Sequence, residues 1–183
     1  LGGYSCIENV IPDLVTYGKA VANGYPIGVL GGKTKYMDKI VCANIKERPL
    51  VAGTYNGHPV GVAAAIATVK ILKNRGKEIG DHLEKLGQIA ESGMQDIFSR
   101  RGIPLAVARL GSAFSFYFMD HCPIDFHDLL LNHNFEKDID LRRKMIGSGI
   151  YFVPVSTKQC SISAAHTEQH IEMMLEKLSD CAE

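Results

Sequence analysis

The sequence predicts an α/β protein in two parts, a parallel α/β part over residues 1–75 and a small α+β domain over residues 76–183. Short apolar runs alternate with stretches of helical periodicity, which is typical of mixed folds. After residue 74 the composition also changes, from alanine-rich to charged. Hydrophobic residues fill 46% of the 183 positions, which is enough for a core.

In the first part, residues 14–17 and 27–30 are short apolar runs that we expect to form strands. An Asn-Gly-Tyr-Pro turn separates them. Residues 34–40 fit one or two turns of helix. Residues 53–59 then form a glycine-punctuated loop, and its last residue, Pro59, suits the first position of a helix.

The helix from Pro59 to about Lys73 is apolar around most of its circumference, so we expect it to lie buried against a sheet. The Asn74-Arg75-Gly76 sequence interrupts this run, and a charged amphipathic helix follows to about Arg101. We therefore place the domain boundary between residues 75 and 76.

The second part alternates strands and helices on a smaller scale. Phe114, Phe116 and Phe118 alternate along one expected strand, which places them on its core face. Thr167 is a good N-cap for the last helix. The expected elements are strands at 105–110 and 113–119, a helix at 135–146, short strands near Tyr151 and Ser161, and a helix at 167–179.

Charge and cysteine content argue against several partner classes. The chain has 20 basic and 20 acidic residues, and no segment concentrates lysine and arginine as a nucleic-acid or anionic-membrane surface requires. We expect no nucleic acid and no membrane as partner. The five cysteines form no CxxC pair, which favours reduced thiols in a cytoplasmic protein. His121, Cys122 and His127 lack a second ligand pair, so we expect no metal.

Two lysines compete for a chemical role in the segment TYGKAVANGYPIGVLGGKT, residues 16–34. Lys33 ends a GVLGGK stretch that resembles a phosphate loop, but such a loop needs glycine five positions before the glycine of its Gly-Lys pair. Ile27 stands there instead. A tight turn is therefore the better interpretation of this stretch.

Lys19 follows an apolar strand, at the carboxyl end where α/β proteins place ligands. A lysine that loses part of its water there can attack a carbonyl carbon and form a Schiff base. Gly18 and Gly24 would let a cofactor approach closely. A solvated surface charge is the alternative interpretation of a lone lysine after a strand.

The stretch AGTYNGHP, residues 52–59, has the parts of a phosphate site. Its glycines free the backbone, Thr54 supplies a hydroxyl, and the following helix presents an electropositive N-terminus. An ordinary capped loop is the alternative interpretation.

Three blocks together resemble the class III pyridoxal-phosphate-dependent aminotransferases, particularly the branch similar to glutamate-1-semialdehyde aminomutase. The segment PDLVTYGKAVANGYPIGVLGG is similar to that family's sequence around the cofactor lysine. AGTYNGHP is similar to its GT-x-x-GNP stretch, and GIYFVP with SISAAHT to its carboxyl-terminal pattern. The blocks occur in the family's order and span nearly the whole chain.

The resemblance implies the type I fold of pyridoxal-phosphate-dependent transferases. Residues 1–75 would be the C-terminal part of the large cofactor-binding domain, and residues 76–183 the small α+β C-terminal domain. The resemblance also implies that Lys19 holds pyridoxal 5'-phosphate as a Schiff base and moves protons. Gly53 and Thr54 would bind the cofactor phosphate of the neighbouring subunit. The protein would be a homodimer with shared active sites and a small amino, keto or aldehyde substrate.

Three departures limit what the resemblance implies. The family's Asp-Glu-Val motif, its glycine-serine phosphate loop and a ring-stacking aromatic would all precede Leu1, so we expect only the second part of such an enzyme. His58 stands where the family carries asparagine. Lys158 stands where the aminomutases carry glutamate, and a base in place of an acid should change the preferred substrate charge.

We therefore favour an aminotransferase over a glutamate-1-semialdehyde 2,1-aminomutase. A non-catalytic fragment or pseudoenzyme that serves in oligomerisation is the alternative from another class. His166 lies in the SISAAHT block, and its role stays unassigned.

Overall fold

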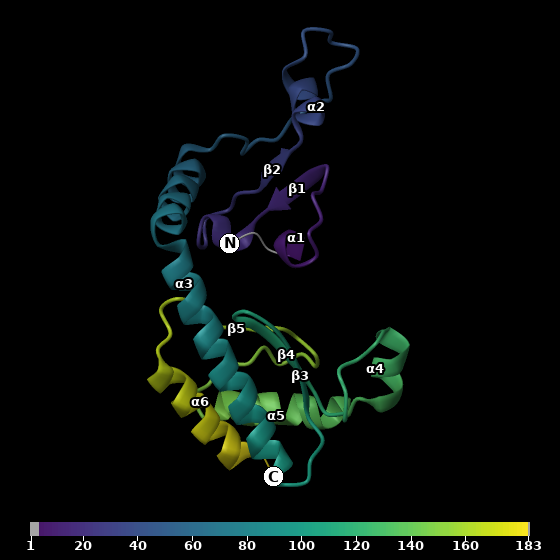
Figure 1. Ribbon diagram of the computed structural model, residues 1–183, viewed down its shortest axis with the longest axis vertical. Coiled ribbons are helices and arrows are strands. Elements are labelled where there is room, and N and C mark those ends of the chain that lie inside the picture. Colours follow the sequence, from purple (N-terminus) through teal and green to yellow (C-terminus); the bar gives the residue numbers. More distant parts are fainter. Residues whose placement is uncertain (1–3, 183) are drawn as a thin grey trace. The chain divides into compact units, whose positions relative to one another are not determined.

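The chain forms two compact units, Leu1–Lys77 and Glu78–Glu183, in a computed structural model that describes residues 4–182. One helix, α3 (Pro59–Ser99), contributes residues to both units (Figure 1). The break expected at Asn74-Arg75-Gly76 is wrong, because these residues continue the helix. A single glycine costs a helix only about 1 kcal/mol, and its charged and apolar neighbours favour helix.

The first unit contains a two-stranded sheet. Its strands β1 (Leu14–Tyr17) and β2 (Val29–Gly32) pair antiparallel, with Leu14 opposite Gly32. The parallel arrangement expected for this part is therefore wrong for the described strands. The connection between them holds only the 3-10 turn η1 (Lys19–Val21), which is too short for the helical crossover that parallel strands need.

The other helices of the first unit are short. They are α1 (Tyr4–Ile7), α2 (Thr34–Met37) and the 3-10 helix η2 (Asp38–Val41). The last two confirm the helical turns expected over residues 34–40. The start of α3 at Pro59 is also confirmed.

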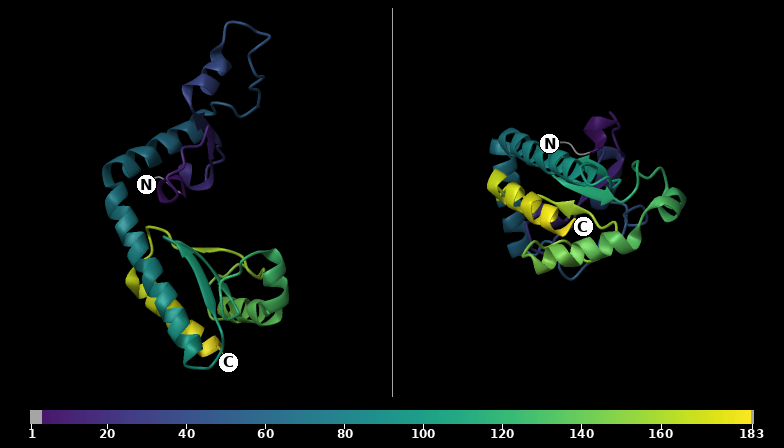
Figure 2. Two further views of the ribbon diagram at one scale, coloured as in Figure 1. Left: turned by 45° about the vertical axis from the view of Figure 1, so that its right-hand side comes forward. Right: turned by 90° about the horizontal axis from the view of Figure 1, so that it is seen from below.

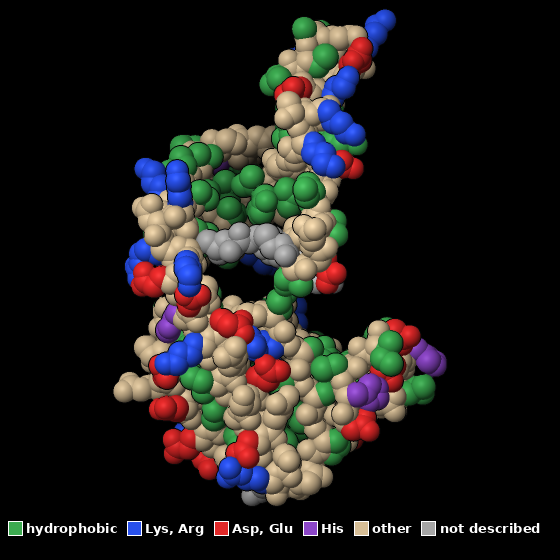
Figure 3. Space-filling view, in the orientation of Figure 1, with side chains coloured by type: hydrophobic (Ala, Val, Ile, Leu, Met, Phe, Trp, Pro, Cys, Tyr) green, Lys and Arg blue, Asp and Glu red, His purple; other side chains and the backbone are tan. Residues whose placement is uncertain are grey.

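Burial of the first part of α3 was expected and is not found. Val60, Ile66, Val69 and Ile71 expose between 50% and 53% of their surface. On the face that Figure 3 shows, hydrophobic side chains gather over this unit. The two-stranded sheet offers too little surface to cover an apolar helix of this length.

The second unit has an antiparallel sheet of three strands in the order β3-β4-β5. Val107 lies opposite Phe116 in the hairpin of the first two strands, and Gly111 turns that hairpin with φ +59°. Figure 2 shows α3 and α6 running side by side in this unit. The elements are β3 (Ala106–Leu110), β4 (Ala113–Tyr117), α4 (Phe126–Asn132), α5 (Phe135–Gly147), β5 (Cys160–Ser161) and α6 (Glu168–Cys181).

The core of the second unit lies between one sheet face and three helices. Phe114, Phe116 and Phe118 expose at most 4% of their surface, which confirms their predicted role. Phe98 of α3 meets Phe118 edge-on, with ring centroids 5.3 Å apart. Helices α5 and α6 add Leu141, Met145, Ile171, Met174 and Leu178 to the same cluster.

Three local expectations for the second unit meet different outcomes. Thr167 caps α6 as predicted, and its side chain and that of His170 form a reciprocal capping box. The strand expected near Tyr151 does not form, and α4 was not expected.

No helix among residues 4–182 is both long enough and apolar enough to cross a membrane.

Candidate functional site

Lys19 lies just after β1, at the start of the turn η1. The preceding Gly18 has an extended backbone, and its carbonyl accepts a hydrogen bond from the Val21 N–H at 3.2 Å. The Lys19 side chain is exposed and lines a shallow concavity. The other lining residues are Ala20, Asn23, Gly24, Tyr25, Pro26 and Ile27. The strand-end position expected for Lys19 is confirmed.

The backbone of Lys19 is strained. Its φ is +51°, in the left-handed region that costs an L residue about 1–2 kcal/mol. Such conformations cluster at ligand-binding and catalytic sites. Within the described part of the chain, no hydrogen bond or ion pair occupies the Lys19 amine. The amine is therefore available to a carbonyl carbon.

Lys33 is already paired. Its Nζ donates to Oδ1 of Asp13 at 2.7 Å, and its backbone N–H donates to the Asp13 carbonyl at 3.0 Å. The hydrogen bond to the Asp13 carboxylate raises the pKa of Lys33, which keeps its amine protonated and non-nucleophilic. Strand β2 ends at Gly32 and α2 begins at Thr34, so Lys33 alone connects them, which is the tight strand-to-helix turn expected here. A Cβ on Gly32 would lie 2.5 Å from the Asp13 carbonyl oxygen.

The loop that contains Gly53 and Thr54 folds back on itself before α3. The Asn56 N–H donates to the Gly53 carbonyl at 3.0 Å, and the His58 N–H donates to the Tyr55 carbonyl at 3.1 Å. A Cβ on Gly53 would lie 2.8 Å from Oδ1 of Asn56, at the end of a flexible, exposed side chain that can move aside. His58 therefore closes the turn with its backbone N–H, although the family that the sequence resembles carries asparagine at this position.

Thr54 is exposed in this loop, close in sequence to the N-terminus of the 41-residue helix α3. The partial positive charge of a helix N-terminus and a nearby hydroxyl both favour an anion. In residues 4–182, no hydrogen bond joins Thr54 to Lys19. The described contacts therefore do not join the Thr54 hydroxyl to the Lys19 amine.

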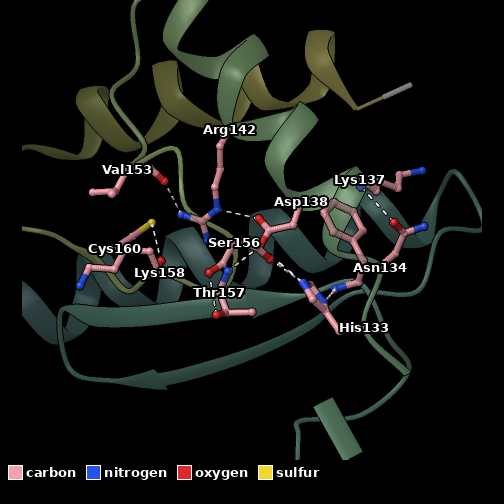
Figure 4. A network of polar contacts seen from close by, with 11 residues as sticks. His133, Asn134, Lys137, Asp138, Arg142, Val153, Ser156, Thr157, Lys158 and Cys160 are labelled. Atoms are coloured by element: carbon pink, nitrogen blue, oxygen red, sulfur yellow. Dashed lines mark hydrogen bonds and ion pairs between the residues drawn. The ribbon is translucent and has the colours of Figure 1, made fainter. Parts of the chain in front are cut away.

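A buried polar network in the second unit escaped the sequence analysis (Figure 4). Asp138 and Arg142 of α5 have fully buried side chains, and the Arg142 Nε donates to Asp138 Oδ1 at 2.6 Å. Burial alone would raise the pKa of Asp138. Hydrogen bonds from His133, Ser156, the Thr157 N–H and Arg142 outweigh burial and hold this pKa below its ordinary value.

Arg142 also reaches two neighbours beyond α5. Its Nη1 donates to the Val153 carbonyl at 3.1 Å, and its guanidinium carbon lies 4.5 Å from the centre of the Phe116 ring. Its Nη2 is buried without a hydrogen-bond partner among the described atoms. The Cys160 thiol lies in the same surroundings, where burial raises its pKa and Arg142 opposes the rise.

Two histidines that the sequence analysis named have ordinary polar partners. The Nδ1 of His166 accepts the Ser163 N–H at 3.0 Å, and nothing in these contacts assigns it a role. His121 bridges Asp120 at 2.6 Å and Asp128 at 3.0 Å, and these carboxylates raise its pKa. In the described residues, no group of three or more His, Cys, Asp or Glu side chains is arranged to hold a metal ion.

Comparison with known proteins identifies the family. The family model Aminotransferase class-III matches residues 3–182. The chain belongs to the class-III aminotransferase family. The predicted resemblance is therefore confirmed over nearly the whole chain.

Curated relatives in this family carry the name glutamate-1-semialdehyde 2,1-aminomutase. One from Desulfitobacterium hafniense is 34% identical over 180 residues, which cover 98% of this chain and 40% of the relative. One from Listeria monocytogenes, named glutamate-1-semialdehyde 2,1-aminomutase 1, is 35% identical over 167 residues, 91% of this chain and 37% of the relative. The chain thus spans about 40% of the length of such relatives.

Solved structures of the family share the fold of this chain. An ω-transaminase from Sphaerobacter thermophilus superposes with a TM-score of 0.83 at 24% identity, covering 99% of this chain and 40% of that one. A glutamate-1-semialdehyde-aminomutase from Pseudomonas aeruginosa PAO1 gives a TM-score of 0.79 at 21% identity, covering 98% and 40%. The predicted fold, the second part of a type I transferase, is confirmed by these likenesses.

Proposed function

We propose that this chain supplies the cofactor lysine of a pyridoxal-phosphate-dependent aminotransferase that acts on a small amine and a keto or aldehyde compound. The observation that carries the proposal is Lys19, which combines a strand-end position, a left-handed backbone and an amine without a partner among the described residues. Residues 1–75 would belong to the large cofactor-binding domain, and residues 76–183 would form the small C-terminal domain.

The residues present fit pyridoxal 5'-phosphate. Lys19 offers an amine to its carbonyl carbon, and Lys33, already paired with Asp13, is a poor competitor. Gly53 has no side chain, so its backbone is open to a phosphate. A structurally similar transaminase has been solved with PLP bound, which supports the same cofactor here. When bound, pyridoxal phosphate supplies an electron sink for the substrate carbon that bears nitrogen.

Lys19 would have two roles in the transfer of nitrogen. Its Nζ would first hold the cofactor, and the incoming substrate amine would then free this nitrogen. The freed Nζ would take the proton from the substrate carbon and return a proton later in the reaction. The short turn η1 would keep the backbone of Lys19 in one place during these steps.

Gly53 and Thr54 would bind the cofactor phosphate of the neighbouring subunit. The Thr54 hydroxyl and the electropositive end of α3 are suited to a dianion. The described residues show no hydrogen bond between Thr54 and Lys19. The fold of one chain is therefore compatible with Thr54 binding the cofactor phosphate of the other subunit in a homodimer. We infer a homodimer with shared active sites.

The alternative function is a glutamate-1-semialdehyde 2,1-aminomutase, which the names of the curated relatives favour. Lys158 favours the aminotransferase, because it replaces the glutamate expected of the aminomutases, and a base in place of an acid should change the preferred substrate charge. The cysteines described, Cys42, Cys122, Cys160 and Cys181, are all free, which supports a cytoplasmic location.

Borohydride reduction of the native protein with pyridoxal phosphate, followed by peptide mapping, tests the proposal. We expect the pyridoxyl group on Lys19 and its loss in the Lys19→Ala variant. Lys33→Ala is the matched control and should be labelled as in the wild type. A label on Lys33 would contradict the assignment, and a protein that takes no label would favour the non-catalytic alternative.

A further inference from the structure

The sequence SAAHTEQH, residues 163–170, repeats one short pattern twice. A hydroxyl residue is followed three positions later by histidine, first as Ser163 and His166 and then as Thr167 and His170. Each histidine N–H donates to the carbonyl of its hydroxyl residue, at 3.0 Å and 3.1 Å. Each Nδ1 in turn accepts the backbone N–H of that residue, at 3.0 Å in both pairs. Two neighbouring imidazole rings are therefore held in the same way.

These bonds place the proton of each neutral ring on Nε2. A backbone N–H can only donate, so Nδ1 of His166 and Nδ1 of His170 must each carry a lone pair. In the described part of the chain, no hydrogen bond or ion pair engages either Nε2. A metal ion would need a lone pair on Nε2, whereas these two nitrogens carry hydrogen. The pair is therefore suited to a ligand that accepts hydrogen bonds.

Both histidines line a cavity of about 640 Å³ in the second unit. This volume lies within the range of about 300–1,000 Å³ that is typical of small-molecule sites. The walls are mainly apolar and include Phe152, Ile162 and Met174 from the hydrophobic core. All the described lining residues belong to the unit Glu78–Glu183, and none of them is Asp, Glu, Lys or Arg.

The two rings lie close together and are anchored from several sides. Their centroids are 5.8 Å apart, with one ring edge-on to the other. The Nε2–H of His82 in α3 donates to the His166 carbonyl at 2.9 Å, and the capping box holds His170. Glu168 lies between the two histidines in sequence, but Lys85 pairs with its carboxylate at 2.6 Å. The surroundings thus present two ordered donors beside a compensated negative charge.

We propose that this cavity binds a small monocarboxylate with an apolar body. The carboxylate accepts hydrogen bonds from Nε2 of His166 and Nε2 of His170, and the apolar body lies against the apolar walls. An ionised carboxylate carries two oxygens that only accept, which matches two fixed donors. Its hydrogen bonds are also roughly twice as strong as those of a neutral acceptor. The inference gives His166 a role that the aminotransferase function does not supply.

Calorimetric titration of the native holoenzyme with octanoate tests the site. We expect one octanoate per chain, with a dissociation constant of about 1 mM or below. Each methylene added between butanoate and octanoate should tighten binding about fourfold, because it removes more apolar surface from water. Octylamine has the same apolar body and a cationic head, so it should bind at least about tenfold more weakly. Equal binding of octylamine, or no binding of octanoate, would overturn the inference.

The donor at His170 can be removed without removing the helix cap. Glutamate at this position completes the usual Thr-x-x-Glu capping box, so His170→Glu should keep the unfolding midpoint of the wild type. It should weaken octanoate binding by at least about 10- to 150-fold, because an acceptor replaces a donor to a charged group. His127→Glu makes the same charge change on α4, away from the cavity lining, and should leave binding unchanged.

The donor at His166 is tested in the same way. In His166→Glu the new carboxylate can still accept the Ser163 N–H, whereas the Nε2–H donor is lost. We expect a loss of octanoate affinity similar to that in His170→Glu. Wild-type affinity in either variant would overturn the assignment of one carboxylate to two histidines.

A variant of the first unit separates this inference from the proposed function. Lys19 is not among the residues that line the cavity, so Lys19→Ala should bind octanoate as the wild type does. The same variant should lose the pyridoxyl label. Loss of octanoate binding in Lys19→Ala would mean that the carboxylate binds at the cofactor lysine, and would overturn this inference while leaving the aminotransferase function standing.

Discussion

The two units of the chain bury their apolar side chains to very different extents. In the unit Glu78–Glu183, one cluster of buried hydrophobic residues runs from Leu86 to Ala182 and joins the sheet to α3, α5 and α6. In the unit Leu1–Lys77, Ala22 is the only buried hydrophobic side chain among the described residues. The second unit therefore has a core of its own. The first presents apolar surface of the kind that marks interfaces.

The largest difference should appear when one apolar side chain is removed from each unit. Phe116→Ala should lower the free energy of unfolding by about 3–5 kcal/mol, because it leaves a cavity in a closed core. Ile66→Ala, at a side chain that is 51% exposed, should change it by no more than about 0.5 kcal/mol. Urea unfolding of the 183-residue chain measures both. Equal losses would mean that the first unit packs as tightly as the second.

A change at the exposed loop of the first unit should act on binding rather than on folding. A hydroxyl that donates to a phosphate contributes about 1.5–3 kcal/mol, so Thr54→Ala in the native holoenzyme should weaken pyridoxal-phosphate binding by about 10- to 150-fold. The unfolding of the apo protein should be unaffected, since Thr54 is exposed. Cofactor titration by absorbance measures the binding.

Mixing subunits tests whether Thr54 acts across the dimer. If it does, combining Lys19→Ala with Thr54→Ala subunits puts both lesions at one site and leaves the other site intact. One site per dimer should then show normal affinity and activity. Only weakened sites in the mixture would mean that Thr54 serves the cofactor of its own subunit.

Two glycines of α3 should respond in opposite directions to the same substitution. A Cβ at Gly87 would overlap the backbone carbonyl oxygen of Gly111 and crowd Arg109, so Gly87→Ala should destabilise the second unit by about 1–3 kcal/mol. No atom lies within 4 Å of a Cβ at Gly80. Gly80→Ala should therefore stabilise the helix by up to about 1 kcal/mol, and thermal unfolding checks both signs.

The smallest effect is expected at the surface of the second unit, where His121 pairs with Asp120 and Asp128. Because the two carboxylates raise the pKa of His121 above its ordinary value of 6.5, folding favours the protonated ring. Its contribution is fully present below pH 6.5, as long as both carboxylates are ionised, and disappears as the pH rises through the folded-state pKa.

The matched variant for this pH effect is His121→Gln. The urea midpoint of the wild type should exceed that of His121→Gln at pH 5.5, and the difference should shrink at pH 8.5. Solvent screening keeps the effect small, since the His121 side chain is 42% exposed. A difference that grows with pH would contradict the protonated bridge.

The sequence correctly predicted the structural features that depend only on residues close together in the chain. The N-cap at Thr167, Pro59 at the start of α3 and the alternating phenylalanines of β4 each depend on neighbouring residues alone, and each was predicted correctly. Helix α4 was missed because its seven residues are too few for helical periodicity to be recognised. Asp125, whose side chain accepts the Asp128 N–H at 2.8 Å, is an N-cap residue that could have indicated the start of this helix.

The network around Asp138 could not be predicted from spacing. Helix α5 contains two pairs of opposite charge at i,i+4, and the sequence alone makes both look like surface ion pairs. Asp138 and Arg142 are buried because they share a helix face with Leu141 and Met145, and the sheet covers that face. The left-handed backbone of Lys19 could not be predicted either. A positive φ is usual for glycine, and this position carries lysine instead.

The surroundings of Cys160 give the second unit a built-in chemical reporter. Thiol reagents attack the thiolate, and burial raises the pKa of Cys160 while Cys122 is exposed. Iodoacetamide at neutral pH should thus alkylate Cys122 well before Cys160. The time course of carbamidomethylation at Cys160, followed by mass spectrometry, would then register each opening of the packed interior around Arg142 without any added probe.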